Sequence, residues 1–122
     1  MGLKSRQKGK RGERAWVRFL REEGGLDARR GLSQSGGAIE PDVVCSDVDF
    51  LHFEVKVGKR QPNLSDAMSQ AKRDAGQKVP VVAHKKDFDG WMITLPAEEF
   101  LSLILGDLPD EKETPKEGSR ND

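Results

Sequence analysis

The chain of 122 residues lacks tyrosine, has a single cysteine, Cys45, and contains no long apolar run. One cysteine cannot form an intramolecular disulfide, so the fold depends on other interactions. No segment approaches the apolar length that a secretory signal or a membrane span requires. These absences predict a soluble cytoplasmic protein. Its length predicts one domain, in which the same fold must both recognise a ligand and act on it.

The formal net charge is zero, but the charges are unevenly placed. Residues 1–30 hold ten Lys/Arg against four Asp/Glu, residues 31–97 hold eight against nine, and residues 98–122 hold three against eight. A basic N-terminal third is typical of proteins that bind a phosphate backbone, because each neutralised phosphate releases counterions. A solvated charged helix is the alternative, and charge alone does not choose between them.

Hydrophobic periodicity predicts three helices and five strands, in an order that gives an α/β fold with a mixed central β-sheet flanked by helices. The strands at 41–45 and 50–57 are expected to form an antiparallel hairpin. Asn63 or Ser65 is the expected cap of the middle helix. The predicted helices cover 12–23, about 64–75 and 96–105, and the predicted strands cover 27–32, 41–45, 50–57, 79–84 and 91–95.

The last helix has apolar residues on more than one side, and the width of this surface predicts burial against both the sheet and a partner subunit. Its apolar residues are Phe100, Leu101, Leu103, Ile104 and Leu105.

In the strand at 50–57, alternate side chains point to opposite faces, and Glu54 and Lys56 share one of them. Asp42 opens the preceding strand. Mg²⁺ is usually bound by one or two carboxylates, with water and substrate phosphate completing its shell. Asp42 and Glu54 supply such a pair, and Lys56 could orient or deprotonate an attacking water or offset charge in the transition state. His52 shares this face, but an imidazole fits poorly beside a magnesium-type carboxylate pair, so it is the less favoured ligand.

Two further features accompany this pattern. Glu13 lies on the inward stripe of the first helix, although an acid favoured by the helix dipole is an equally good interpretation. The loop at 33–37, Ser-Gln-Ser-Gly-Gly, could seat a phosphate, although a plain flexible turn is the commoner explanation. A Glu-x-Lys triplet alone is weak, since about 0.4 would occur by chance in a chain of this length. The combination is more specific than any part of it.

Glu13, the Ser/Gly loop, Pro41-Asp42 and Glu54-Val55-Lys56, in this order, resemble the PD-(D/E)xK nuclease superfamily. The spacing is most similar to archaeal-type and phage Holliday junction resolvases, over about residues 8–100. The resemblance implies a restriction-endonuclease-like core, a homodimer that nicks four-way DNA junctions, and Mg²⁺ or Mn²⁺ as cofactor. A phage-encoded protein of this kind would act in the host cytoplasm.

Carried over to this chain, the resemblance implies that Asp42, Glu54 and the Val55 carbonyl ligate the metal. Glu13 would reach the metal or its water, and Lys56 would serve the nucleophile. A loop serine would support catalysis, and Ser35 is preferred to Ser33 because glycines follow it.

The expected domain limits are a flexible basic arm over residues 1–9, a nuclease domain over 10–106 and a disordered acidic tail over 107–122. Other nucleases of the superfamily, acting on duplex, flap or single-stranded DNA, and a non-catalytic DNA-binding module are the competing functions. The residues expected to contact DNA are Lys8, Lys10, Arg11, Arg14, Ser33, Lys59, Arg60, Lys72, Arg73, Lys85 and Lys86.

Overall fold

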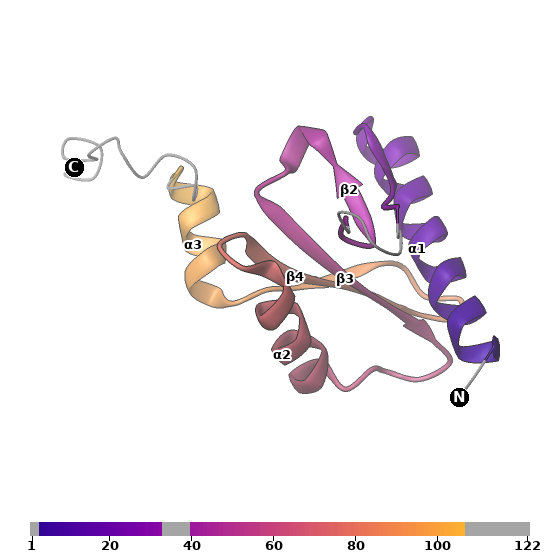
Figure 1. The fold of residues 1–122 in the computed structure, drawn as a ribbon. Helices are drawn as coiled ribbons and strands as arrows, with labels where there is room; N and C mark the ends of the chain where they lie inside the picture. Colours follow the sequence, from indigo (N-terminus) through magenta and orange to yellow (C-terminus); the bar gives the residue numbers. More distant parts are fainter. Residues whose placement is uncertain (1–2, 33–39, 107–122) are drawn as a thin grey trace.

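The computed structural model describes residues 3–32 and 40–106, with side chains from residue 9 onward, and it confirms an α/β fold with a mixed sheet (Figure 1). Ser33 and Ser35 lie outside the described residues. The elements in chain order are α1 (Leu3–Gly24), β1 (Ala28–Arg30), β2 (Val43–Cys45), the 3-10 turn η1 (Ser46–Val48), β3 (Leu51–Gly58), α2 (Leu64–Ala75), β4 (Val79–Lys86), β5 (Met92–Thr94) and α3 (Ala97–Leu105).

The main sheet has the order β3-β4-β5, with β4 parallel to β3 and antiparallel to β5. The parallel pair is in register over its whole length, from Leu51 opposite Val79 to Gly58 opposite Lys86. The strands β1 and β2 form a separate antiparallel pair, in which Arg30 lies opposite Val43. The mixed sheet expected from the order of elements is therefore confirmed.

The predicted hairpin between strands 41–45 and 50–57 is wrong. β2 pairs with β1, and the turn η1 followed by Asp49 and Phe50 carries the chain from the small sheet to the main one. Strand β4 is buried continuously from Val79 to His84, as is typical of a strand covered on both faces, and it is the neighbour of β3. Pairing over eight residues with this apolar strand outweighs the short local pairing that proximity in the sequence favours.

Helix α1 begins at Leu3, earlier than predicted, so residues 3–9 form its first turns instead of an arm in front of it. This segment contains no proline, and its lysine, arginine and glutamine residues are good helix formers that tolerate the single Gly9. Farther along the helix, Gly12 lies against β3, where an added Cβ would come within 3.2 Å of Val57 Cγ2. The helix therefore packs close to the strand that carries Glu54.

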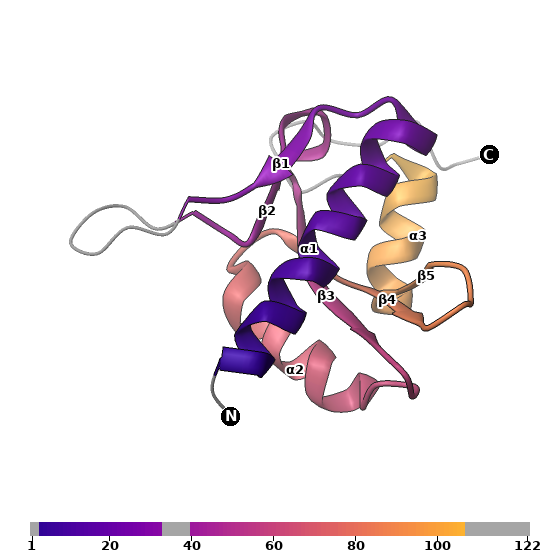
Figure 2. The same ribbon diagram turned by 90° about the vertical axis from the view of Figure 1, so that its right-hand side faces the viewer.

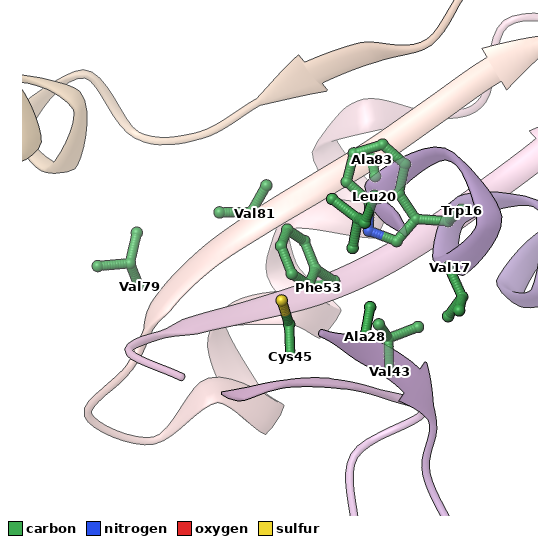
Figure 3. Packing of buried hydrophobic residues seen from close by; sticks show 10 residues of the cluster. All are labelled: Trp16, Val17, Leu20, Ala28, Val43, Cys45, Phe53, Val79, Val81 and Ala83. Carbon is green, nitrogen blue, oxygen red and sulfur yellow. The ribbon is translucent and has the colours of Figure 1, made fainter. Parts of the chain in front are cut away.

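Helix α1 and helix α2 cover opposite faces of β3 and β4 (Figure 1). The larger core lies on the α1 side, and β1 and β2 lie beside that helix (Figure 2). In this core Trp16 packs against Phe53 and Trp91, with ring centroids 5.4 and 4.9 Å apart. Its buried residues, drawn in Figure 3, are Trp16, Val17, Leu20, Ala28, Val43, Cys45, Phe53, Val79, Val81 and Ala83.

On the other face, Asn63 caps α2 by accepting a hydrogen bond from the Asp66 N–H (3.0 Å), which decides between the two expected caps. Ala67 and Ala71 pack against Val82 of β4. Small side chains at these positions let the helix approach the sheet closely, so polar groups on this face of β3 lie beneath α2.

Helix α3 departs from the prediction of burial on two sides, because none of its residues is buried. Phe100, Leu101, Ile104 and Leu105 are 49 to 61% exposed, and Met92 and Ile93 of the adjoining strand β5 are 61% and 45% exposed. We call these six residues the α3–β5 apolar surface. Among the described residues, no helix is long and apolar enough to cross a membrane.

Candidate active site

Glu54 and Lys56 lie on one face of β3, as the alternation of strand side chains predicts. Lys56 Nζ is 3.4 Å from Glu54 Oε2. Glu54 is 9% exposed, whereas the Lys56 side chain is 38% exposed. Burial raises the pKa of Glu54, and the charge of Lys56 opposes this effect. The pair therefore places an amine beside a largely buried carboxyl group.

Asp42 and Glu54 line one pocket, which lies between the start of β2, the middle of β3 and the end of α2. Asp42 is exposed and immediately precedes β2, and Pro41 lies beside it in the wall. The negative charge of Asp42 also contributes to the raised pKa of Glu54. The predicted carboxylate pair is thus brought to a single pocket, although the two strands that carry it are not hydrogen-bonded partners.

Glu13 faces Asp42 from helix α1. Burial and the negative charge of Asp42 raise the pKa of Glu13, while a hydrogen bond from Arg30 lowers it. Arg30 Nε donates this bond to Glu13 Oε1 at 3.3 Å. The Glu13 side chain is only 17% exposed, so the inward position that the helical stripe indicated is confirmed. Because α1 begins at Leu3, Glu13 is not in its first turn, so the helix dipole does not account for this acid.

A further carboxylate at the pocket, Glu40, is already occupied by protein donors. Arg29 holds it with two hydrogen bonds of 2.8 and 2.7 Å, and the Leu32 N–H donates a third. These bonds lower the pKa of Glu40 to about 2. Glu40 therefore has a structural role, because its hydrogen bonds hold the backbone that precedes Asp42.

The donor set fits a hard divalent cation. Glu13, Asp42 and Glu54 offer carboxylate oxygens, and backbone carbonyls such as that of Val55 are also oxygen donors of the kind that Mg²⁺ and Mn²⁺ accept. Burial and the negative charge of Asp42 raise the pKa values of Glu13 and Glu54, and a bound cation favours the ionised form of both. These carboxylates are chemically suited to a divalent cation, but the three ligand residues that the described part of the chain brings within 4.8 Å of one another are His52, Glu54 and Asp74.

Asp74, which no sequence motif indicated, joins the site from the last turn of α2. One ligand atom each of His52, Glu54 and Asp74 lies within 4.8 Å of the others. Asp74 is three residues after the buried Ala71 and seven after Ala67, so helical spacing places it at the border of the packed stripe. This spacing was the one feature of the sequence that could have pointed to Asp74. It does so only when α2 is known to pack across β3.

Basic side chains line two hollows along α1. Arg11, Arg14, Arg18 and Lys59 surround the first, near the end of β3, and Arg14, Arg18, Arg21 and Arg30 surround the second. Arg14 and Arg18 belong to both, so the hollows form one basic track, which ends at the Arg30 partner of Glu13. Arg18 was not among the predicted DNA contacts.

The remaining predicted DNA contacts are more scattered. Lys10 and Arg60 are exposed on α1 and after β3, and the side chain of Lys8 is outside the described part of the chain. Lys85 and Lys86 end β4 beside Val57 and Gly58 of β3. Lys72 and Arg73 are exposed on α2, and Lys72 lines a hollow that also contains Glu98 and Glu99.

The site has an aspartate directly before a short strand, and then a glutamate and a lysine two residues apart on a mixed sheet. This arrangement defines the site type of a PD-(D/E)xK nuclease. The family model of the archaeal Holliday junction resolvases (Hjc) matches residues 4–96, which include every described residue of the site above. The chain belongs to this family, whose members are nucleases that act on DNA junctions in recombination and repair. No curated protein sequence matches the chain significantly.

Proposed function

We propose that this chain resolves four-way DNA junctions by metal-dependent hydrolysis of phosphodiester bonds. The observation that carries the proposal is the 3.4 Å approach of Lys56 to Glu54 in the pocket that also holds Asp42. A pocket with convergent carboxylates, one of which is largely buried and has a raised pKa, is the expected form of such a site. Membership of the Hjc family supports the choice of a branched DNA substrate.

In this proposal Asp42 and Glu54 are the metal ligands, with the Val55 carbonyl as a further oxygen donor. Glu13 contacts the metal or its water from α1. The bound Mg²⁺ or Mn²⁺ supplies positive charge next to the scissile phosphate and lowers the pKa of coordinated water. The buried position of Glu54 and the Arg30 contact of Glu13 restrict both side chains, which keeps the ligands oriented.

Lys56 is the residue that serves the nucleophile. Its amine lies beside Glu54 and remains partly exposed, so it can reach a water or a phosphate oxygen. It acts either by orienting and deprotonating the attacking water or by offsetting charge in the transition state. Ser35, or Ser33, is proposed to support this step from the segment between Leu32 and Glu40.

The DNA backbone is proposed to follow the basic track of α1. Arg11, Arg14 and Arg18 are spaced three and four residues apart, so they rise about 4.5 and 6 Å along the helix on one side. Phosphate contacts by such residues supply affinity and register without reading sequence. The track reaches Arg30, the partner of Glu13, and so connects the bound backbone to the carboxylate pocket.

We propose that two copies of the chain form a homodimer through the α3–β5 apolar surface. Half-exposed Phe100, Leu101 and Ile104 lie on one short helix without a covering element among the described residues. Exposed apolar patches of this kind commonly mark protein interfaces. A two-fold dimer presents two identical sites, as cleavage of two strands of a junction requires.

A cleavage assay on a four-way junction tests the function, beside duplex, flap and single-stranded DNA of the same sequences. We expect Mg²⁺-dependent or Mn²⁺-dependent cleavage of the junction and little cleavage of the linear duplex. Equal cleavage of all four substrates would reject junction specificity and leave a general nuclease. Junction binding without cleavage in either metal would instead favour a DNA-binding module.

A further inference from the structure

Three possible metal ligands meet between β3 and α2. His52 and Glu54 are two residues apart on β3, so their side chains leave the same face of the strand. Asp74 approaches from the last turn of α2, the helix that covers this face. One ligand atom from each lies within 4.8 Å of the others. Only Glu54 of these three belongs to the metal ligands proposed above.

His52 lies in the wall of the pocket that holds Glu54. Its side chain is 8% exposed and lines this pocket together with Glu54 and Asp74. The other histidine, His84, is engaged elsewhere, since its Nε2 is 2.9 Å from Thr94 Oγ1. His52 therefore brings a ring nitrogen to within 4.8 Å of two carboxylates.

The spacing of these groups suits one ion. Metal–ligand distances are about 2.1 Å, so two ligands on opposite sides of an ion lie about 4.2 Å apart. Side chains already within 4.8 Å reach that distance by small rotations. Asp74 is exposed and can make such a rotation freely.

The donor types favour a transition metal over Mg²⁺. Mg²⁺ prefers oxygen ligands and retains several waters, whereas imidazole nitrogen is a good ligand for first-row transition metals. One imidazole and two carboxylates bind such ions with water completing the shell. This set differs from the all-oxygen set of Glu13, Asp42, Glu54 and the Val55 carbonyl.

We propose that His52, Glu54 and Asp74 form a second divalent-metal position that shares Glu54 with the Asp42 position and selects Mn²⁺ or a similar transition-metal ion over Mg²⁺. The role of this position in DNA cleavage rests on the proposed function. Its metal binding does not, because it can be measured on the full chain without DNA.

Electron paramagnetic resonance of added Mn²⁺ provides a direct test. A histidine ligand gives nitrogen coupling to the bound ion, and the chain contains only two histidines. We expect nitrogen coupling in the wild-type protein and in His84→Gln, and its loss in His52→Gln. Absence of nitrogen coupling in wild-type protein that binds Mn²⁺, or its persistence in His52→Gln, would overturn the proposal.

Substitution of Asp74 gives a second test that avoids the core, because this residue is exposed. Asp74→Asn is expected to weaken Mn²⁺ binding at the nitrogen-coupled position by about tenfold or more. Asp66→Asn, an exposed aspartate on the same helix, is the matched control and should bind as the wild type does. Equal Mn²⁺ affinity in the two variants would contradict a role for Asp74. Circular dichroism confirms that both variants fold.

A third variant separates this inference from the proposed function. Asp42→Asn should abolish junction cleavage while keeping nitrogen-coupled Mn²⁺, since Asp42 is not a ligand of the second position. Nitrogen-coupled Mn²⁺ in a wild-type protein that cleaves no DNA would support the metal position and reject the nuclease. Cleavage with Mn²⁺ in the absence of nitrogen coupling would reject the metal position and leave the nuclease intact.

Discussion

The backbone N–H of Gly31 donates a hydrogen bond to the carbonyl oxygen of Asp42, with a distance of 2.9 Å. A Cβ on residue 31 would collide with the backbone carbonyl oxygen of Pro41, directly before Asp42. A glycine here therefore permits the close approach of two backbone segments that places Asp42 at the pocket.

Gly31→Ala is expected to displace the Pro41-Asp42 backbone, because backbone atoms cannot move aside as a flexible side chain would. We expect a loss of about 1–3 kcal/mol in the free energy of unfolding and weaker metal binding. Denaturant unfolding and a Mn²⁺ titration measure the two effects. Gly90→Ala is the control, since a Cβ there meets nothing within 4 Å. Identical behaviour of both variants would show that the close approach at Gly31 is unimportant.

Asp42→Asn and Glu54→Gln should each reduce junction cleavage by about a hundredfold or more, because each removes a charged metal ligand. Binding of the junction should remain close to that of the wild type, since phosphate contacts by Lys and Arg carry the affinity. A single-turnover cleavage assay and a gel-shift titration distinguish the two effects. Asp49→Asn, at an exposed turn before β3, should leave both unchanged. Full cleavage by either ligand variant would mean that the site is elsewhere.

Arg18→Ala is expected to weaken junction binding and to reduce the slope of log affinity against log salt by about one, as the loss of one phosphate contact requires. Affinity titrations at several salt concentrations give this slope. Lys78→Ala offers a matched removal of positive charge in the hollow that contains Glu98 and Glu99, away from the basic track. If both variants changed the slope equally, overall charge and not the α1 track would explain the binding.

Ile104→Lys is expected to convert a dimer into a monomer, because it places a charge in the proposed interface. Ile104 is 61% exposed in the single chain, so the substitution should not disturb the fold of the monomer. Light scattering coupled to size-exclusion chromatography measures the mass. Leu32→Lys changes an equally exposed apolar side chain outside the α3–β5 apolar surface and should leave the dimer intact. A wild-type protein that is monomeric at micromolar concentration would argue against this interface.

His84 is expected to make stability depend on pH. Burial lowers the pKa of its imidazole below the ordinary value of 6.5, so the unfolded chain binds a proton more readily than the folded one. The stabilisation is therefore complete above pH 6.5 and is lost as the pH falls below that value. Melting temperatures from pH 8 to 5.5 should fall less in His84→Gln than in the wild type. Parallel curves would indicate that His84 does not titrate in this range.

Sequence reasoning predicted the features that depend on local periodicity. The order of helices and strands, the inward stripe with Glu13 and the shared face of Glu54 and Lys56 all follow from repeats of 3.6 or two residues. Each of these features was found in the structure. A Glu-x-Lys triplet is weak evidence by itself. It indicates a site here because it lies in an apolar strand that places both side chains on one face.

Features that depend on contacts between distant segments could not be predicted in this way. The pairing of β3 with β4 in preference to β2, and the entry of Asp74 into the pocket, are decided by which elements bury the most surface together. Periodicity assigns a side chain to a face but does not identify the element that covers that face. The sequence by itself determined which side chains share a strand face or a helix stripe, whereas tertiary packing decided that His52 and Asp74 adjoin Glu54 and that Arg30 contacts Glu13.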